Sequence, residues 1–161
     1  MDWLETTDFF VAPASSRYHL SQEGGLLEHS LNVYKRLLKM TEAMGVNTSL
    51  ETMSIVALFH DFCKINLYKK GVKNVKEDGK WVQKPCYEYH EQFPYGGHGA
   101  KSVYLIERFL KLTEEEAVCI HNHMGSYDRL PNDFSLSAAY KAYPLALLLH
   151  SADNIATCID E

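Results

Sequence analysis

Histidines in apolar helical stretches are the residues of this chain best suited to chemistry. The 161-residue sequence holds eight, and His29, His60, His98 and His150 each lie in or against an apolar helical stripe. Burying several imidazoles in one small core costs free energy unless each has a partner. A shared cation would be such a partner, because neutral imidazole nitrogens and carboxylate oxygens both bind divalent transition metals. The pattern therefore predicts a metal site.

Two aspartates stand where they could complete such a site. In the stretch ALFHDFCK, His60 and Asp61 are adjacent at the end of an apolar run. Adjacent side chains on a helix diverge by about 100°, so the pair can share one ion if the helix ends there, or serve two ions if Asp61 bridges them. Two bridged cations that share a hydroxide are the arrangement of two-metal phosphoester hydrolysis. In LLLHSADNIA, His150 and Asp153 share a helix face, and the preceding leucines indicate that Asp153 points inward.

The order of these residues resembles the H…HD…H…H…D pattern of the HD-domain metal-dependent phosphohydrolase superfamily. The resemblance covers nearly the whole chain, and its specificity comes from the full ordered set in helical contexts, since a bare His-Asp pair is common. The first block is also similar to the HD domain of bacterial 3′–5′ exoribonucleases of the YhaM type. The stretches that carry the resemblance are GGLLEHSLNV, FHDFCK, FPYGGHGAKSVYLIERF and IHNHMGSYD.

The resemblance implies a dinuclear metal centre. Its implied cofactors are two divalent transition-metal ions, with iron or manganese favoured and nickel, cobalt, zinc or magnesium as alternatives. In IHNHMG, His121 and His123 cannot face the same way on a helix, and the family pattern favours His123 as the ligand. The positions that match the family's ligands are His29, His60, Asp61, His98, His123 and Asp153.

Four further positions are candidates for contact with a substrate. Lys64 matches the lysine of the frequent HDxxK form, where it would contact a phosphate and, with Asp61, act in catalysis; the alternative is a solvated lysine after a helix end. Arg17 and His19 precede a glycine pair and either bind phosphate at the mouth of the site or belong to an ordinary loop. His121 would face the substrate, support a metal ligand or simply be exposed.

The activity implied by the resemblance is hydrolysis of a phosphoester by a metal-bound hydroxide. The substrate would be a phosphomonoester or phosphodiester of a nucleotide or related anion, so the expected partner is a small phosphorylated molecule. Two alternatives from other classes stay open. One is a di-iron oxygenase of the same superfamily, and the other is a metal-binding regulatory domain without turnover.

Helices must hold these residues, and apolar periodicity predicts five or more of them. The expected fold is an all-α HD-domain bundle with a β-hairpin or ordered loop inserted around residues 71–95, where an Asp-Gly pair separates strand-like runs. Ser49 and Thr113 are the expected N-caps, Gly45 is the expected C-terminal cap, and Pro144 should kink or restart the last helix. The predicted helices span residues 24–45, 49–62, 98–112, 113–124 and 137–160.

Composition limits the possible number of domains, the possible partners and the possible location of the protein. The length suits a single domain over residues 1–161, and the net charge of −5 argues against extended nucleic-acid binding while leaving room for a local basic patch. The chain does not start with a basic and then apolar leader, and no apolar run could span a bilayer, so we expect a cytoplasmic protein without a membrane partner. The four widely spaced cysteines predict free thiols. The sequence indicates no particular oligomeric state.

Overall fold

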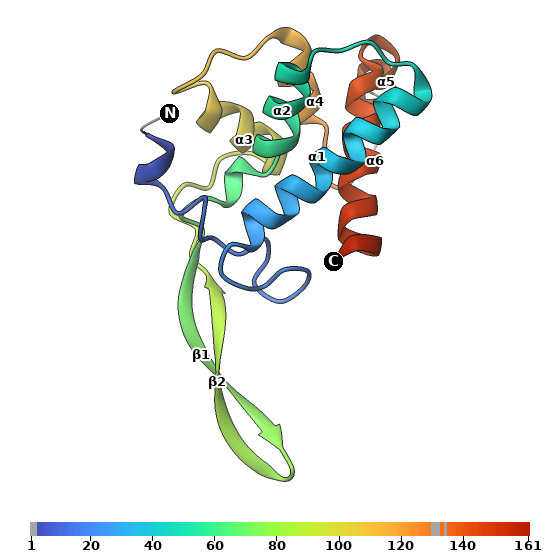
Figure 1. Ribbon diagram of the computed structural model, residues 1–161. Helices are drawn as coiled ribbons and strands as arrows, with labels where there is room; N and C mark the ends of the chain where they lie inside the picture. The colour runs from blue at the N-terminus through green and yellow to red at the C-terminus, as the bar shows by residue number, and fades with distance from the viewer. Residues whose placement is uncertain (1–2, 130–132, 134) are drawn as a thin grey trace. The chain divides into compact units, whose positions relative to one another are not determined.

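The fold is mostly helical, with one antiparallel hairpin among the described residues (Figure 1). The computed structural model describes residues 3–129, 133 and 135–161. The chain forms two compact units, a hairpin unit of Met1–Leu27 and Lys64–Pro94 and a helical unit of Glu28–Cys63 and Tyr95–Glu161. The expectation of a single domain stays a prediction. The elements are α1 (Gly25–Met44), α2 (Leu50–Phe59), β1 (Tyr68–Glu77), β2 (Lys80–Tyr89), α3 (His98–Ile106), α4 (Glu114–His121), α5 (Ser135–Ala142) and α6 (Pro144–Ile155).

Within the helical unit, α4 packs against three other helices. It contacts α2, α3 and α6, and α6 also contacts α5. Cys119 and Ile120 of α4 are fully buried, as are Leu145 and Leu149 of α6. Burying one large apolar side chain contributes about 1.5–3 kcal/mol. This apolar interior therefore fixes the helices that carry the predicted metal ligands.

The ends of these helices follow the capping residues that the sequence predicts. Ser49 accepts a hydrogen bond from the Thr52 N–H at 2.9 Å and begins α2. Gly45 ends α1 with a φ of +63°, a conformation that favours a residue without a Cβ. Pro144 is the first residue of α6, where its missing N–H leaves no hydrogen bond unmade. The last helical region is therefore restarted at Pro144, which divides it into α5 and α6.

Thr113 forms a complete capping box at the start of α4. Its hydroxyl accepts from the Glu116 N–H at 3.3 Å, and the Glu116 carboxylate accepts from the Thr113 N–H at 2.8 Å. We expect Thr113→Ala to lower the free energy of unfolding by about 1 kcal/mol, because a helix N–H loses its acceptor. Chemical denaturation measures the loss, and Thr113→Ser should stay close to wild type. Equal losses in the two variants would contradict the role of the hydroxyl.

The hairpin unit contains two long strands joined by a two-residue turn. β1 and β2 pair antiparallel over their whole length. Asp78 and Gly79 have φ values of +49° and +80°, and a type I′ turn requires positive φ at both positions. The predicted hairpin is confirmed, although its first strand already begins at Tyr68. The base of the hairpin is closed by the His90 N–H, which donates to the Leu67 carbonyl at 2.8 Å.

Two expectations from composition also bear on the described residues. All four cysteines are free thiols, as their spacing predicts. No helix in the described ranges is both long enough and apolar enough to cross a membrane.

Candidate metal centre

The His-Asp pair lies where α2 ends, inside the helical unit. His60 keeps helical dihedral angles after the last residue of α2, and a 3₁₀ turn begins at Phe62. The side chains of the pair are buried, with 0% of His60 and 4% of Asp61 exposed. The Cys63 N–H donates to the hydroxyl of Ser102 at 3.0 Å, which ties the turn to α3. The end of α2 thus carries two adjacent polar side chains into one buried cluster.

Three side chains from three parts of the helical unit converge on one point. The Nε2 atoms of His29 and His60 are 3.2 Å apart. Asp153 Oδ1 lies 3.2 Å from His29 Nε2 and 3.9 Å from His60 Nε2. Two imidazole nitrogens and one carboxylate oxygen in this arrangement could hold a metal ion. These three residues are called the three-residue cluster below.

Asp61 faces both the three-residue cluster and a further histidine. Its Oδ2 lies 3.6 Å from the Nε2 atoms of His29 and His60, whereas its Oδ1 lies 3.5 Å from His123 Nε2. A carboxylate in this position can give one oxygen to each of two cations. The Nε2 atom of His123 is buried and makes no hydrogen bond within the described part of the chain. A buried nitrogen of this kind fits a metal ligand, because buried polar atoms otherwise find hydrogen-bond partners.

Backbone carbonyls orient two of the imidazoles. His60 donates from Nδ1 to the Ala57 carbonyl at 2.9 Å, and His123 donates from Nδ1 to the Ile120 carbonyl at 2.8 Å. A carbonyl oxygen can only accept, so each ring carries a proton on Nδ1, and Nε2 is the nitrogen left to bind a metal. Hydrogen bonds of this kind fix the orientation of metal-binding histidines.

Glu161 joins the site although it was not among the predicted residues. Its carboxylate oxygens accept from His29 Nδ1 at 3.0 and 3.1 Å. The chain reaches this position because α6 continues as a π-helical turn over Ala156–Asp160. Arg36 of α1 holds that turn by donating from Nε to Asp160 Oδ2 at 2.7 Å. No ligand motif includes Glu161, so only the folded chain reveals its contact with His29.

The charges of the cluster are set by burial and by its neighbouring acids. Burial lowers the pKa of His29, but hydrogen bonds to Asp153 and Glu161, helped by the charge of Asp61, outweigh it and raise the pKa to about 9. Burial lowers the pKa of His60 to about 4. Burial raises the pKa of Asp153, yet the hydrogen bond from His29 brings it down to about 2. A protonated His29 therefore balances an ionised Asp153, and a divalent cation could supply that positive charge in its place.

His98 is the first residue of α3, which packs closely against the end of α4. A Cβ on the next residue, Gly99, would lie 2.1 Å from the His121 carbonyl oxygen, so this approach requires glycine. The Nδ1 atom of His98 is buried and has no hydrogen-bond partner among the residues described here. The distances given above bring together five of the six predicted ligand positions, and the role of all six as metal ligands stays a prediction.

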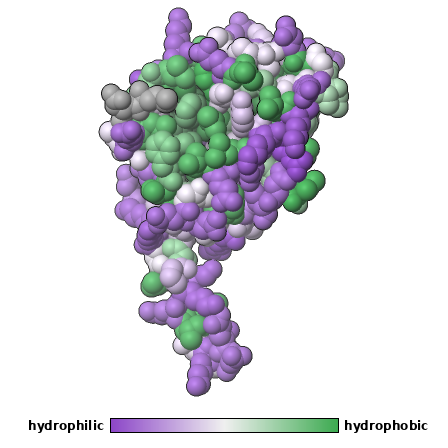
Figure 2. Space-filling model, viewed as in Figure 1, coloured by the Kyte–Doolittle hydropathy of each residue, from purple (hydrophilic) through white to green (hydrophobic). Residues whose placement is uncertain are grey.

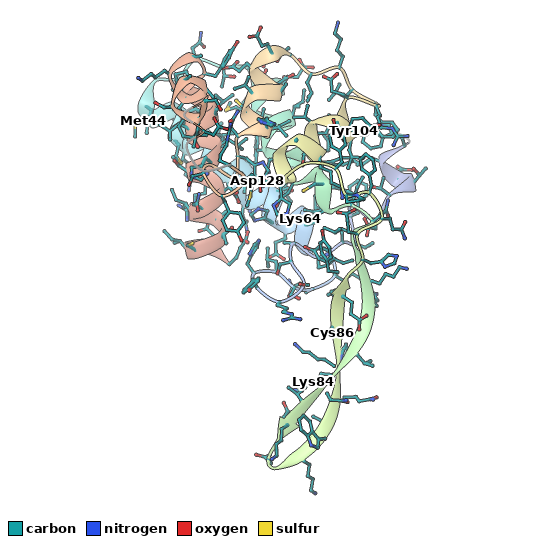
Figure 3. The ribbon with its side chains drawn as sticks, turned by 180° about the vertical axis from the view of Figure 1, so that it is seen from behind. Met44, Lys64, Lys84, Cys86, Tyr104 and Asp128 are labelled. Carbon is teal, nitrogen blue, oxygen red and sulfur yellow. The ribbon has the colours of Figure 1, made fainter. Side chains whose placement is uncertain are left out.

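Asp128 caps α3 from a distant part of the chain (Figure 3). The N-cap position, Gly97, has no side chain, and Asp128 Oδ2 instead accepts from the Gly99 N–H at 3.3 Å. We expect Asp128→Ala to lower the free energy of unfolding by about 1 kcal/mol, since the first turn of α3 loses an acceptor. Thermal unfolding measures this loss, and Asp128→Asn should retain most of the stability because an amide oxygen can still accept. Wild-type stability in Asp128→Ala would contradict the capping role.

Two other histidines of the helical unit take different places. His121 is the last residue of α4 and is exposed, whereas His123 is fully buried. This difference agrees with the preference for His123 over His121 as a ligand. His150 donates from Nδ1 to the His123 carbonyl at 2.6 Å, so it holds the backbone beside a predicted ligand. A contact between His121 and substrate stays a prediction.

The remaining predicted substrate contacts belong to the hairpin unit. Arg17, His19 and Lys64 fall within its two segments. Arg17 is exposed, and His19 and Lys64 are half-buried. Their roles in substrate binding, and the catalytic role of Lys64, stay predictions.

The chain matches a described family over most of its length. The family model for the HD domain matches residues 26–158. The chain belongs to the HD domain family. The matched range contains all six positions of the H…HD…H…H…D pattern, from His29 to Asp153. The resemblance recognised in the sequence is therefore confirmed at the level of the family.

A curated protein is similar to part of this HD domain. The chain is 39% identical over 72 residues to the dihydroneopterin 2′,3′-cyclic phosphate phosphodiesterase of Methanocaldococcus jannaschii. The match covers 42% of the chain and 27% of that relative, so the chain spans about a quarter of the relative's length. No solved structure gives a significant match.

Proposed function

We propose that this HD domain is a phosphohydrolase that cleaves a phosphoester at a centre of two divalent metal ions. The observation that carries the proposal is the position of Asp61, whose two oxygens face different imidazoles. The three-residue cluster would hold one ion, and His123 with His98 would hold the other. Asp61 would be shared between them. Nitrogen and oxygen ligands in this mixture suit iron or manganese, which are the metals we propose.

The protein residues would prepare the site for this chemistry in three ways. The hydrogen bonds that His60 and His123 donate from Nδ1 to backbone carbonyls orient both rings and leave Nε2 to face a metal ion. Asp61 would supply one carboxylate oxygen to each of the two ions. Burial lowers the local dielectric and strengthens electrostatic interactions with an anionic substrate. When bound, the ions would polarise a phosphoester oxygen and lower the pKa of a water molecule toward neutrality.

The substrate class we propose is a small, nucleotide-like phosphoester. The relative from Methanocaldococcus jannaschii is named for its action on a 2′,3′-cyclic phosphate. The likeness between the two chains is partial, so it supports a phosphoester substrate in general and leaves the choice between a phosphomonoester and a phosphodiester to experiment.

A substrate panel tests this function. Nucleotides, 2′,3′-cyclic phosphates, cyclic dinucleotides and short RNA would be incubated with protein stripped of metal and reloaded with Mn²⁺ or Fe²⁺. We expect ester cleavage that requires the added metal and is lost in His60→Ala. His90→Ala, a histidine of the hairpin unit outside the metal centre, is the matched control and should remain active.

Two outcomes would overturn the proposal, and each identifies another function. Oxygen consumption with a diol substrate and no ester cleavage would show a di-iron oxygenase. Tight metal binding without turnover of any substrate in either assay would show a regulatory domain.

A further inference from the structure

The hairpin carries a concentration of basic side chains that the metal centre does not use. Six lysines and three acids lie between Tyr68 and Tyr89, so this segment is positively charged in a chain whose net charge is −5. Most positions of both strands are exposed. Figure 2 shows the hairpin covered mainly by hydrophilic residues, with only small separate hydrophobic patches. An exposed basic element in an acidic chain indicates an anionic partner.

The strand register places the aromatic rings and two of the six lysines on one face of the hairpin, and the other four lysines on the opposite face. Side chains two residues apart on a strand project from the same face, and so do residues paired directly across the two strands. Trp81 is 71% exposed and Tyr89 is 63% exposed, which is unusual for such large rings. The rings of this aromatic face lie in the pairs Tyr68 with Tyr89, Lys70 with Tyr87 and Lys76 with Trp81, and the pairs Val72 with Pro85 and Asn74 with Gln83 lie between them.

A groove of about 630 Å³ lies beside the base of the hairpin. Residues 16–18 form one wall, and both strands contribute the other. Arg17 and Lys73 bring two positive charges to the groove against the one negative charge of Glu88. Lys73 reaches it from the opposite face of the hairpin, while Tyr87 and Tyr89 line it from the aromatic face. Neither Arg17 nor Lys73 forms an ion pair with any residue that the structure describes. Both cations are thus available to an anion beside the tyrosine rings.

We propose that the aromatic face and this groove bind single-stranded nucleic acid. Bases would stack on Trp81, Tyr87 and Tyr89, and backbone phosphates would lie beside Lys73 and Arg17. Aromatic rings combined with a positively charged groove are how proteins bind single strands with little sequence preference, because every base offers a stacking face. The local charge of the hairpin thus provides the basic patch that the net charge of the whole chain left open.

Other occupants fit the hairpin less well. The core of a protein–protein interface is depleted of lysine, whereas two rings of the aromatic face are each paired across the strands with a lysine. The bases of a duplex are already stacked on one another, so they offer few faces to the rings.

Fluorescence anisotropy with a labelled RNA of about twelve nucleotides and mixed sequence tests the proposal. The full chain would be titrated in EDTA, which prevents metal-dependent cleavage. We expect the single strand to bind about tenfold more tightly than a duplex of the same sequence, with affinity that falls as salt rises. Trp81→Ala and Lys73→Glu should each raise Kd about tenfold, and Trp81→Phe should retain most of the affinity because it keeps a ring.

Matched controls lie on the helical unit. Phe109→Ala and Lys111→Glu change exposed residues of the same types and should leave Kd within about twofold of wild type. An unchanged Kd in both hairpin variants, or equal affinity for duplex and single strand, would overturn the proposal. The proposal would also be overturned if the protein did not bind RNA but bound anionic lipid vesicles or self-associated, and the hairpin variants abolished that binding or self-association. Because the assay needs no turnover, its result is independent of the proposed hydrolase activity.

Discussion

Asp61→Asn is expected to lower kcat/KM for phosphoester cleavage by about 10³-fold or more. Asparagine keeps the size of the side chain but loses its negative charge and one of the two oxygens that face the imidazoles of His29, His60 and His123. Polarisation by metal ions is worth several kcal/mol in the transition state, and each 1.4 kcal/mol is a factor of ten in rate. Initial rates with added Mn²⁺ on the best substrate of the panel measure the effect.

The matched control for this change is Asp78→Asn. Asp78 lies in the turn of the hairpin with a φ of +49°, a conformation that asparagine accepts readily. This variant undergoes the same chemical change outside the metal centre and should keep its activity within about twofold. If Asp61→Asn also kept wild-type activity, Asp61 could not be the shared ligand on which the proposed function rests.

Phe62→Ala is expected to lower the free energy of unfolding by about 3–5 kcal/mol. Phe62 follows Asp61 directly and is fully buried. Its ring packs edge-on against that of Phe59, with the centroids 5.6 Å apart at an interplanar angle of 89°. Alanine would remove most of this buried surface and leave a cavity next to the His-Asp pair. The loss is a large part of the about 5–15 kcal/mol that stabilises a typical domain.

Urea denaturation measures the loss of stability, and two further variants separate the effect of burial from the effect of removing a ring. Phe62→Leu fills much of the cavity and should lose less stability than Phe62→Ala. Phe109→Ala removes an aromatic ring that is 48% exposed and should change stability much less. Similar losses at Phe62 and Phe109 would show that Phe62 is not the buried support of the pair.

Local rules predicted most of the helical unit. The caps at Gly45, Ser49 and Thr113 and the restart at Pro144 all follow from the chemistry of single residues, so the sequence reveals them. The length of a helix is harder to predict from local sequence. α3 ends at Ile106 and α4 at His121, whereas the apolar pattern extended the predicted helices to residues 112 and 124. The chain turns soon after α4, where Gly125 has a φ of +59°.

The sequence predicts which residues belong to the candidate site. It does not predict which atoms of these residues face one another. The H…HD…H…H…D order identifies His60 and Asp61, yet only the folded chain shows how the two oxygens of Asp61 are divided. The folded chain alone also shows that the backbone approaches closely beside His98, where a Cβ on Gly99 would lie 2.1 Å from the His121 carbonyl oxygen. Glu161 is 132 residues from His29, and no motif links residues at that distance.

The metal content of the purified protein tests the central claim most directly. Protein loaded with Fe²⁺ or Mn²⁺ without oxygen and then desalted would be measured by elemental analysis alongside Asp61→Asn. Two ions bridged by a shared carboxylate predict about two metal equivalents per wild-type chain and the loss of at least one in the variant. At most one equivalent in the wild type, unchanged in Asp61→Asn, would contradict a dinuclear centre.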